Sequence, residues 1–233
     1  MQANPRIGVV TGLEFESDVI RRRARHDGLA DKILVRAGLG RQRARQAAEA
    51  LLAEGATALL SFGIAGGLDP NVPCETAVIA TAIKAEKMPT LACTPAWIER
   101  MSKSIRASQS GALAYAPAIL VTSMDKAGTF TATGALAADM ESYGIGEAAL
   151  AANVPFAALR VVADTAGDVL PEIALHAIAP DGSFKLGETL GRVLRNPTQL
   201  PGRLRLGRAT GRARNRLDDL AAAAVGKLFF AYD

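Results

Sequence analysis

The sequence predicts an α/β protein in which helices cover both faces of a buried sheet. Short apolar runs rich in β-branched residues alternate with segments of helical periodicity. Because these runs are apolar almost throughout, the strands should be buried on both faces, as in α/β sandwiches. The predicted strands are residues 7–10, 33–35, 58–62, 77–80, 119–121 and 157–162.

Two helices are predicted between these strands. Residues 41–54 carry apolar side chains at helical spacing, and residues 139–152 form a second, largely apolar helix that stops at Asn153 and Pro155. In sheets of this class, ligands bind at the carboxyl ends of the strands. The residues directly after each strand are therefore the first candidates for a functional site.

Composition excludes several classes of protein. Hydrophobic residues make up 49% of the 233 residues, enough for a large core. Two cysteines without a CxxC pair and two histidines offer little for a disulfide framework or a zinc site, so we expect no metal and a reducing, cytoplasmic compartment. No apolar run is long enough to span a bilayer, and residues 1–25 are too charged for a signal peptide.

Acidic residues and glycines follow the first two strands. Glu14 and Glu16 lie at a strand-to-helix turn, where a helix N-terminus would keep carboxylates ionised. The alternative is two acids on an exposed first turn of the helix. Gly12 and Gly40 lie in the turns after the first and second strands, where glycine lets the backbone approach an anion. Residues 63–68 form either a tight turn or a bed for a phosphate or sugar.

Two later acids are stronger candidates. Glu141 follows Met140 near the start of an apolar helix, and Asp164 stands after the strand at 157–162. A buried carboxylate is costly unless it is paired or used, so both acids are candidate site residues. The alternative for Asp164 is a helix cap.

In this order, the segments resemble the nucleoside phosphorylase and nucleosidase superfamily, in the branch of methylthioadenosine/S-adenosylhomocysteine nucleosidases. The resemblance implies a three-layer αβα sandwich around a mixed central sheet. Residues 170–209 also resemble the tail of a subgroup, the hopanoid-associated phosphorylases. The matching stretches are IGVVTGLEFE (7–16), the glycine turn at 38–40, FGIAGGLDP (62–70) and ADMESYGIGEAALAANVPFAALRVVADTAGD (138–168).

The resemblance implies a role for each candidate acid. Cleaving a purine N-ribosidic bond needs an acid for the departing base, an anchor for the ribose hydroxyls and a nucleophile below the ring. By position, Asp164 matches the acid at the purine and Glu16 the residue that activates water. Glu141 matches the ribose anchor, with Met140 packing on the sugar.

The remaining site residues concern the nucleophile and the base. Arg160 matches an arginine near the nucleophile and, with Gly12 and Gly40, is the candidate to hold a phosphate. The base-binding segment should fall near residues 122–125, which makes Ser123 and Asp125 its candidates.

This sequence lacks part of the nucleophile pocket that is typical of each branch of the superfamily. Nucleosidases usually carry a serine where Ile64 stands, and the arginine motif of the phosphorylases is absent from residues 11–16 and 61–67. Water and inorganic phosphate, the one expected co-substrate, therefore both remain open as nucleophiles. The presence of Glu16 favours water. No other cofactor is expected.

The sequence thus predicts an enzyme that cleaves the N-ribosidic bond of a 5′-substituted adenosine. The subgroup resemblance favours adenosylhopane, with adenine released in hopanoid biosynthesis. One alternative is a soluble methylthioadenosine/S-adenosylhomocysteine nucleosidase. A non-catalytic RNA- or lipid-binding module is the other alternative, although aromatic residues at 5% leave little for stacking on bases, so no nucleic-acid partner is expected.

Charge divides the chain unevenly. Residues 185–216 contain nine basic residues and one acid, a net of +8, which leaves −4 for the rest of a chain whose net charge is +4. We expect a catalytic domain at residues 1–181 and a basic helical segment at 182–233, packed on it or extending from it. This segment is either a solvated helical face or a contact to an anionic membrane surface, at the inner face of the membrane. The family resemblance also implies a homo-oligomer.

Overall fold

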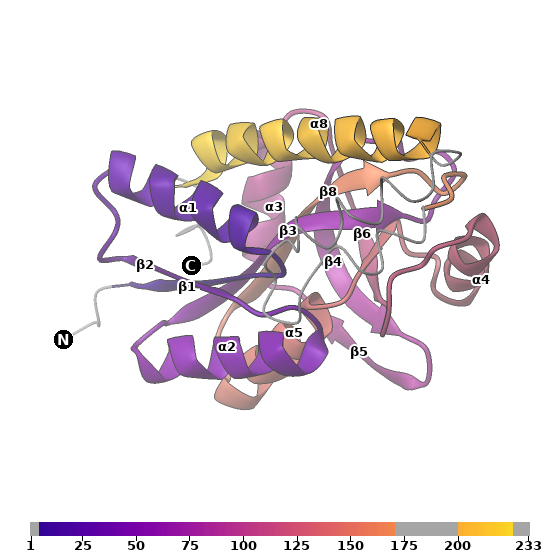
Figure 1. Ribbon diagram of the computed structural model, residues 1–233. Helices are drawn as coiled ribbons and strands as arrows, with labels where there is room; N and C mark the ends of the chain where they lie inside the picture. The colour runs from indigo at the N-terminus through magenta and orange to yellow at the C-terminus, as the bar shows by residue number, and fades with distance from the viewer. Residues whose placement is uncertain (1–4, 171–199, 226–233) are drawn as a thin grey trace.

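The computed structural model describes residues 5–170 and 200–225. Helices cover both faces of a central sheet, as predicted (Figure 1). The strands are β1 (Ile7–Thr11), β2 (Ile33–Ala37), β3 (Ala58–Gly67), β4 (Ala77–Ala85), β5 (Met88–Ala92), β6 (Ser108–Tyr115), β7 (Ala137–Asp139) and β8 (Phe156–Asp164). The helices are α1 (Glu14–His26), α2 (Arg41–Ala53), α3 (Pro95–Ser104), α4 (Ser123–Thr133), α5 (Ser142–Ala152) and α8 (Leu200–Ala224).

The sheet is mixed. Its strands run in the order β2-β1-β3-β7-β6-β4-β5, and β8 pairs with both β3 and β4. This pairing closes a ring of five strands: β3, β7, β6, β4 and β8. The pairs β1·β2, β1·β3, β3·β8, β4·β6 and β6·β7 are parallel, and β3·β7, β4·β5 and β4·β8 are antiparallel. The predicted α/β fold with a mixed sheet is confirmed.

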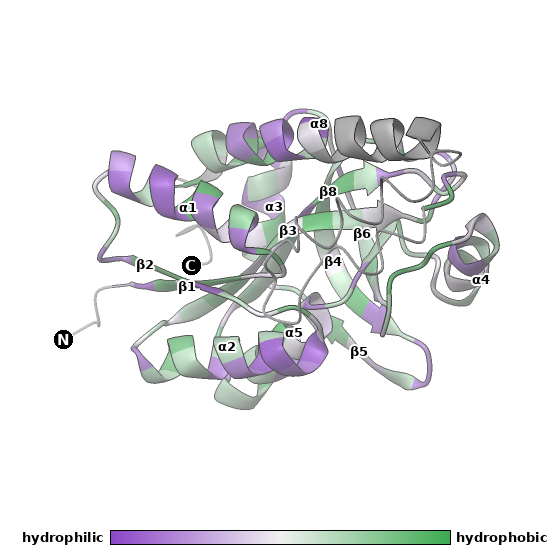
Figure 2. Cartoon of the chain, viewed as in Figure 1, coloured by the Kyte–Doolittle hydropathy of each residue, from purple (hydrophilic) through white to green (hydrophobic). Residues whose placement is uncertain are grey.

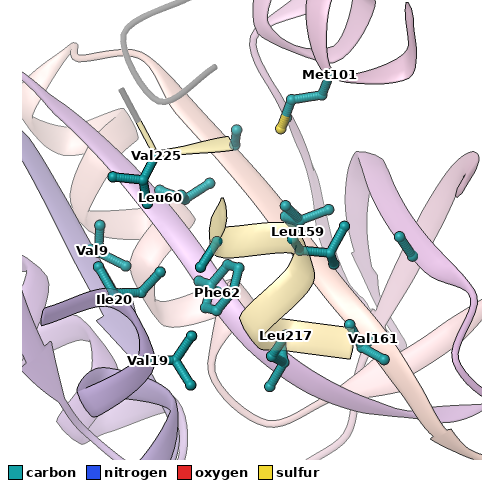
Figure 3. Close-up of a cluster of buried hydrophobic side chains, with 14 of the residues drawn as sticks. Val9, Val19, Ile20, Leu60, Phe62, Met101, Leu159, Val161, Leu217 and Val225 are labelled. Carbon is teal, nitrogen blue, oxygen red and sulfur yellow. The ribbon is translucent and has the colours of Figure 1, made fainter. Parts of the chain in front are cut away.

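One hydrophobic layer lies between the sheet and helices α1, α3 and α8. Phe62 on β3 lies between Val19 and Ile20 of α1 and Leu217 of α8, and Leu159 on the adjacent strand β8 belongs to the same cluster (Figure 3). All five side chains are at most 1% exposed. Because α8 fills this layer, it is part of the core although it lies far along the chain from α1.

The second layer lies between the sheet and helices α2 and α5. Ala44, Ala48 and Leu51 form the buried face of α2, while Ile145 and Ala148 belong to α5. Small side chains let these two helices approach each other and the sheet closely. Most exposed residues of α2 are polar. Figure 2 shows purple and green residues together on this helix.

Three arginines in the described part of α8 contact other parts of the protein. Arg212 pairs with Glu75 at 2.7 Å, and the guanidinium of Arg214 lies over the ring of Phe15 at 5.7 Å. Arg216 donates to the carbonyl of Arg106. The other basic residues of the predicted segment lie outside the residues whose side chains are described, as does the boundary at residue 181, which stays a prediction.

Some predicted elements were wrong. Residues 119–121 form no strand; they follow Pro117, which has no N–H for a ladder, and are half-buried. The sixth strand instead lies at β6, whose Ser-Gln-Ser-Gly start carries no apolar pattern. The helix predicted at 139–152 begins only at Ser142, because residues 137–139 are strand β7.

Across residues 5–170 and 200–225, no helix has the length and apolar character needed to cross a membrane.

Candidate active site

The turn between β1 and α1 buries one of its two acids. Glu16 is 1% exposed, whereas Glu14 points to solvent. The Glu16 carboxylate accepts N–H groups from Gly12 at 3.0 Å and Leu13 at 2.9 Å on Oε2, and from Ile64 at 2.8 Å on Oε1. From the first turn of α1, the Glu16 side chain can fold back onto the N–H groups that precede the helix, as in a capping box. The alternative of two exposed acids is therefore wrong for Glu16.

A second buried carboxylate comes from the start of α5. Glu141 occupies the N-cap of this helix, and its Oε1 accepts the N–H of Gly40 at 2.9 Å. A Cβ on Gly12 would lie 3.1 Å from the Glu141 carboxyl group, so Gly12 packs directly against this acid. The turns after β1, β2 and β7 thus converge on one point.

Arg160 lies fully buried in β8 and contacts side chains from several of these elements. Its Nε is 2.6 Å from Oδ2 of Asp139. Nη2 donates to Oγ of Ser61 at 2.7 Å and lies 3.6 Å from Oε2 of Glu141. Within the part of the chain that the structure describes, Nη1 has no hydrogen-bond partner. Arg160 therefore has one donor nitrogen left for a ligand.

Nη1 of Arg160 and the carboxylate of Glu16 both lie close to Gly63 on β3. A Cβ on Gly63 would lie 2.5 Å from Nη1 of Arg160 and 2.6 Å from Oε1 of Glu16. Only a glycine leaves room for the two groups on this side of the strand. We call Glu16, Glu141, Arg160 and Gly63 the ribose-end cluster.

Burial sets the charge of this cluster. It raises the pKa of Glu16, against the opposing effect of the Arg160 guanidinium. It also raises the pKa of Glu141 to about 7, again opposed by Arg160 and reinforced by the Asp139 carboxylate. A carboxyl group near its pKa at neutral pH can both donate and accept a hydrogen bond, which suits contacts to hydroxyl groups.

Asp164 stands at the carboxyl end of β8, opposite Gly66 of β3. Its Oδ2 contacts the ammonium group of Lys126, a side chain only 1% exposed. The same Nζ donates to the carbonyls of Thr165 at 2.7 Å and Asp168 at 3.0 Å. Burial raises the pKa of Asp164, and Lys126 acts against that rise. We call Asp164 and Lys126 the base-end pair.

The two centres lie along one strand. Gly63 and Gly66 are three residues apart on β3, which is about 10 Å of extended chain. A sugar joined to a purine can span such a distance. The two centres are named after the ribose and the base that the sequence-based prediction assigns to them. The predicted reaction needs a group for the nucleophile at one end and an acid at the other.

The sequence-based prediction did not include Lys126, because the predicted base-binding segment ended at residue 125. The structure places Ser123 and Asp125 on the exposed first turn of α4, where Asp125 and Thr122 cap the helix through mutual hydrogen bonds. A base-binding role for these two residues stays a prediction. The available signal for Lys126 was its isolation, since it is the only basic residue between Arg106 and Arg160.

Met140 is half-buried beside Glu141, and its predicted contact with a sugar stays untested. A cleft of about 740 Å³ opens next to Gly40, lined by Arg41, Tyr115 and Glu147 among others. Among the described residues, no three His, Cys, Asp or Glu side chains are grouped closely enough to hold a metal ion.

Fold and site together define an enzyme that cleaves the N-glycosidic bond of nucleosides. The profile of the Phosphorylase superfamily matches residues 16–194, most of the chain. The protein belongs to this superfamily. A search of curated protein sequences found no match.

Several solved structures with the same fold are nucleosidases, at low sequence identity. The 5′-methylthioadenosine/S-adenosylhomocysteine nucleosidase from Helicobacter pylori is 14% identical, with a TM-score of 0.65 over 94% of this chain and 98% of that one. The S. pneumoniae enzyme is 13% identical, with a TM-score of 0.65 over 94% and 99%. The Colwellia psychrerythraea enzyme, solved with adenine, is 16% identical, with a TM-score of 0.62 over 71% and 84%.

Proposed function

We propose that the protein hydrolyses the N-ribosidic bond of a 5′-substituted adenosine and releases adenine. The observation that carries this proposal is the placement of Glu16 beside Nη1 of Arg160, which has no hydrogen-bond partner among the described residues, with Asp164 further along β3. The relatives of the same fold are named as nucleosidases of methylthioadenosine and S-adenosylhomocysteine, which supports an adenosine derivative as substrate.

In the proposed reaction, each centre has one task. Glu16 takes a proton from the attacking water, and Nη1 of Arg160 helps to hold that water. Glu141 binds the ribose hydroxyls. The bond between the sugar carbon and the base nitrogen breaks, its electron pair goes to adenine, and Asp164 gives a proton to the departing base. The oxocarbenium-like sugar then takes up the water oxygen.

The geometry favours water over phosphate. The N–H groups of Gly12, Leu13, Ile64 and Gly40, which could cradle a phosphate, already donate to the two glutamates. An entering phosphate would find one free guanidinium nitrogen and two carboxyl groups. Carboxylates repel anions in a buried site, where charges interact strongly. Phosphate as co-substrate therefore becomes the less favoured branch of the proposal.

The identity of the 5′ substituent rests on sequence. The resemblance of residues 170–209 to hopanoid-associated phosphorylases supports adenosylhopane. The cleft of about 740 Å³ beside Gly40 is lined mainly by charged and polar side chains, so it does not add support for an apolar substituent. Methylthioadenosine and S-adenosylhomocysteine, the compounds in the names of the relatives, are the alternative substrates.

A membrane-bound substrate is compatible with the basic segment. We propose that the enzyme works in the cytoplasm as a homo-oligomer and that basic residues between 185 and 208 hold it at an anionic membrane surface. Neutralising these residues should weaken flotation with anionic vesicles and leave the cleavage of soluble adenosine analogues unchanged. Unchanged flotation contradicts the membrane role alone.

Adenine release tests the function directly. Purified protein is incubated with adenosylhopane and with methylthioadenosine, each with and without phosphate, and free adenine is measured. Glu16→Gln should lower the rate by about 10² to 10⁴, the contribution typical of a general base. Glu14→Gln changes an exposed acid two residues away and should leave the rate unchanged.

The outcomes separate the alternatives. Adenine released from either substrate without phosphate supports a nucleosidase, and the preferred substrate identifies the 5′ group. Adenine release only in the presence of phosphate would show that phosphate, and not water, is the nucleophile. No adenine under any of the four conditions contradicts the proposed function and leaves a non-catalytic binding module.

A further inference from the structure

We propose that Lys126 is a positioning residue that fixes the charge and orientation of Asp164, so that the proton for the departing base leaves from Oδ1. The proposal rests on the proposed function, because it assigns the proton of that reaction to one oxygen. Lys126 holds Oδ2 of Asp164 and is itself buried, at 1% exposure. The substrate would therefore meet the other oxygen of the carboxyl group.

Lys126 has no donor left for a substrate. Its ammonium group has three N–H bonds, and the structure gives it three acceptors: Asp164 Oδ2 and the carbonyls of Thr165 and Asp168. It acts through Asp164 and not by contact with the reacting atoms. The two carbonyls also fix the loop that follows β8 to helix α4.

In the proposed reaction, Lys126 stabilises the negative charge that forms on Asp164. When Asp164 gives its proton to a ring nitrogen of adenine, it becomes a buried carboxylate. A buried anion without a partner is costly, so an isolated aspartic acid would be a poor proton donor. The ammonium group of Lys126, already in contact with Oδ2, stabilises the carboxylate as it forms. Lys126 thereby makes Asp164 a stronger acid.

Three charged or titratable groups surround Asp164 among the described residues. Lys126 comes from α4, Asp168 from the loop after β8, and Cys74 from the loop before β4. Asp168 raises the pKa of Asp164, while burial raises the pKa of the Cys74 thiol. Lys126 is thus the only positive group of the three, and its removal should raise the pKa of Asp164 further.

The pH profile distinguishes this role from a structural one. Asp164 works in its protonated form, so activity is lost as pH rises through its pKa. Lys126→Met should move this alkaline limb of kcat/KM upward by at least one pH unit and lower the plateau of kcat by about 10- to 100-fold, with KM changed less than threefold. Lys126→Arg should restore the limb to the wild-type pH.

Lys84→Met is the matched control. Lys84 donates to the carbonyl of Thr133 at the other end of α4, at 2.7 Å, so its removal also costs this helix a partly buried ammonium contact. It should leave the alkaline limb in place. A lower rate in Lys126→Met with an unmoved limb would overturn the proposal and leave Lys126 as a structural residue.

Titration of Asp164 without turnover keeps the two proposals separate. In protein labelled with ¹³C at the aspartate carboxyl, the resonance lost in Asp164→Asn reports Asp164. Its titration should move to higher pH in Lys126→Met. If wild-type protein releases no adenine, the proposed function fails, and this titration still tests the Lys126 contact. An equal titration in both proteins contradicts the proposal.

Discussion

The ribose-end cluster and the base-end pair hold their carboxylates in different ways. At the ribose end, the backbone N–H groups of four residues bind Glu16 and Glu141. The positive charge of Arg160 acts on both acids. At the base end, a single lysine side chain binds Asp164. Backbone donors persist through most substitutions, whereas a side-chain partner is lost in one step. The geometry of the first centre is therefore a property of the fold, and the charge of the second depends on one residue.

The largest expected effect is the removal of the shared arginine. Arg160→Met leaves Asp139 and Glu141 buried without their cation and should lower the free energy of unfolding by about 3–5 kcal/mol. The loss should be smaller at pH 5 than at pH 8, because protonation relieves a carboxylate that has lost its partner. Urea unfolding at both pH values measures it.

Arg22→Met is the control for this variant. Arg22 pairs with Asp218 at 2.8 Å, with both side chains about half exposed. An exposed pair of this kind contributes less than about 1 kcal/mol. An equal loss in the two variants would contradict the view that Arg160 is the electrostatic centre of the ribose end.

The next effect concerns the pH dependence of stability. Burial raises the pKa of Glu141 to about 7 in the folded protein, from its ordinary value of 4.5. Its stabilising contribution is therefore complete below pH 4.5 and is lost as pH rises through about 7. Glu141→Gln cannot ionise and should remove this dependence, on the order of 3 kcal/mol between pH 4.5 and 8.

Denaturant unfolding across that pH range tests the prediction. Glu14→Gln, which alters an exposed acid, should keep the wild-type dependence. If wild-type stability rose between pH 5 and 8 by as much as it is expected to fall, Glu141 would be held as a carboxylate. Glu141 would then be ionised at neutral pH and could only accept hydrogen bonds from hydroxyl groups.

Much of this arrangement could be predicted from local sequence. Apolar runs gave five of the eight strands, and Asp164 was correctly expected at a strand end. What could not be predicted depends on partners far along the chain. Strand β6 begins with three consecutive polar residues and is stabilised by pairing with β4 and β7, which no local pattern encodes. The contact between Lys126 and Asp164 joins residues 38 positions apart for the same reason.

A smaller effect is expected from a methyl group at the ribose end. In Gly63→Ala, the new Cβ would lie 2.5 Å from Nη1 of Arg160 and 2.6 Å from Oε1 of Glu16, so one of these groups must move. Overpacking of this kind costs about 1–3 kcal/mol of stability. A displacement of about 1 Å should lower kcat about 100-fold. Thermal unfolding and adenine release measure the two effects, and an active, fully stable variant would contradict the close approach at this glycine.

The smallest effect is expected three residues further along the same strand. In Gly66→Ala, the new Cβ would lie 3.6 Å from both carboxylate oxygens of Asp164, an ordinary van der Waals contact. The substitution also restricts the unfolded chain, which typically stabilises a protein by about 0.4–1 kcal/mol where the native backbone accepts alanine. Gly66→Ala should therefore unfold at or slightly above the wild-type temperature, and the alkaline limb should stay at its pH because Lys126 keeps its contact. A loss of stability as large as that of Gly63→Ala would mean that both ends are equally crowded. The difference between them would then lie in their charged partners alone.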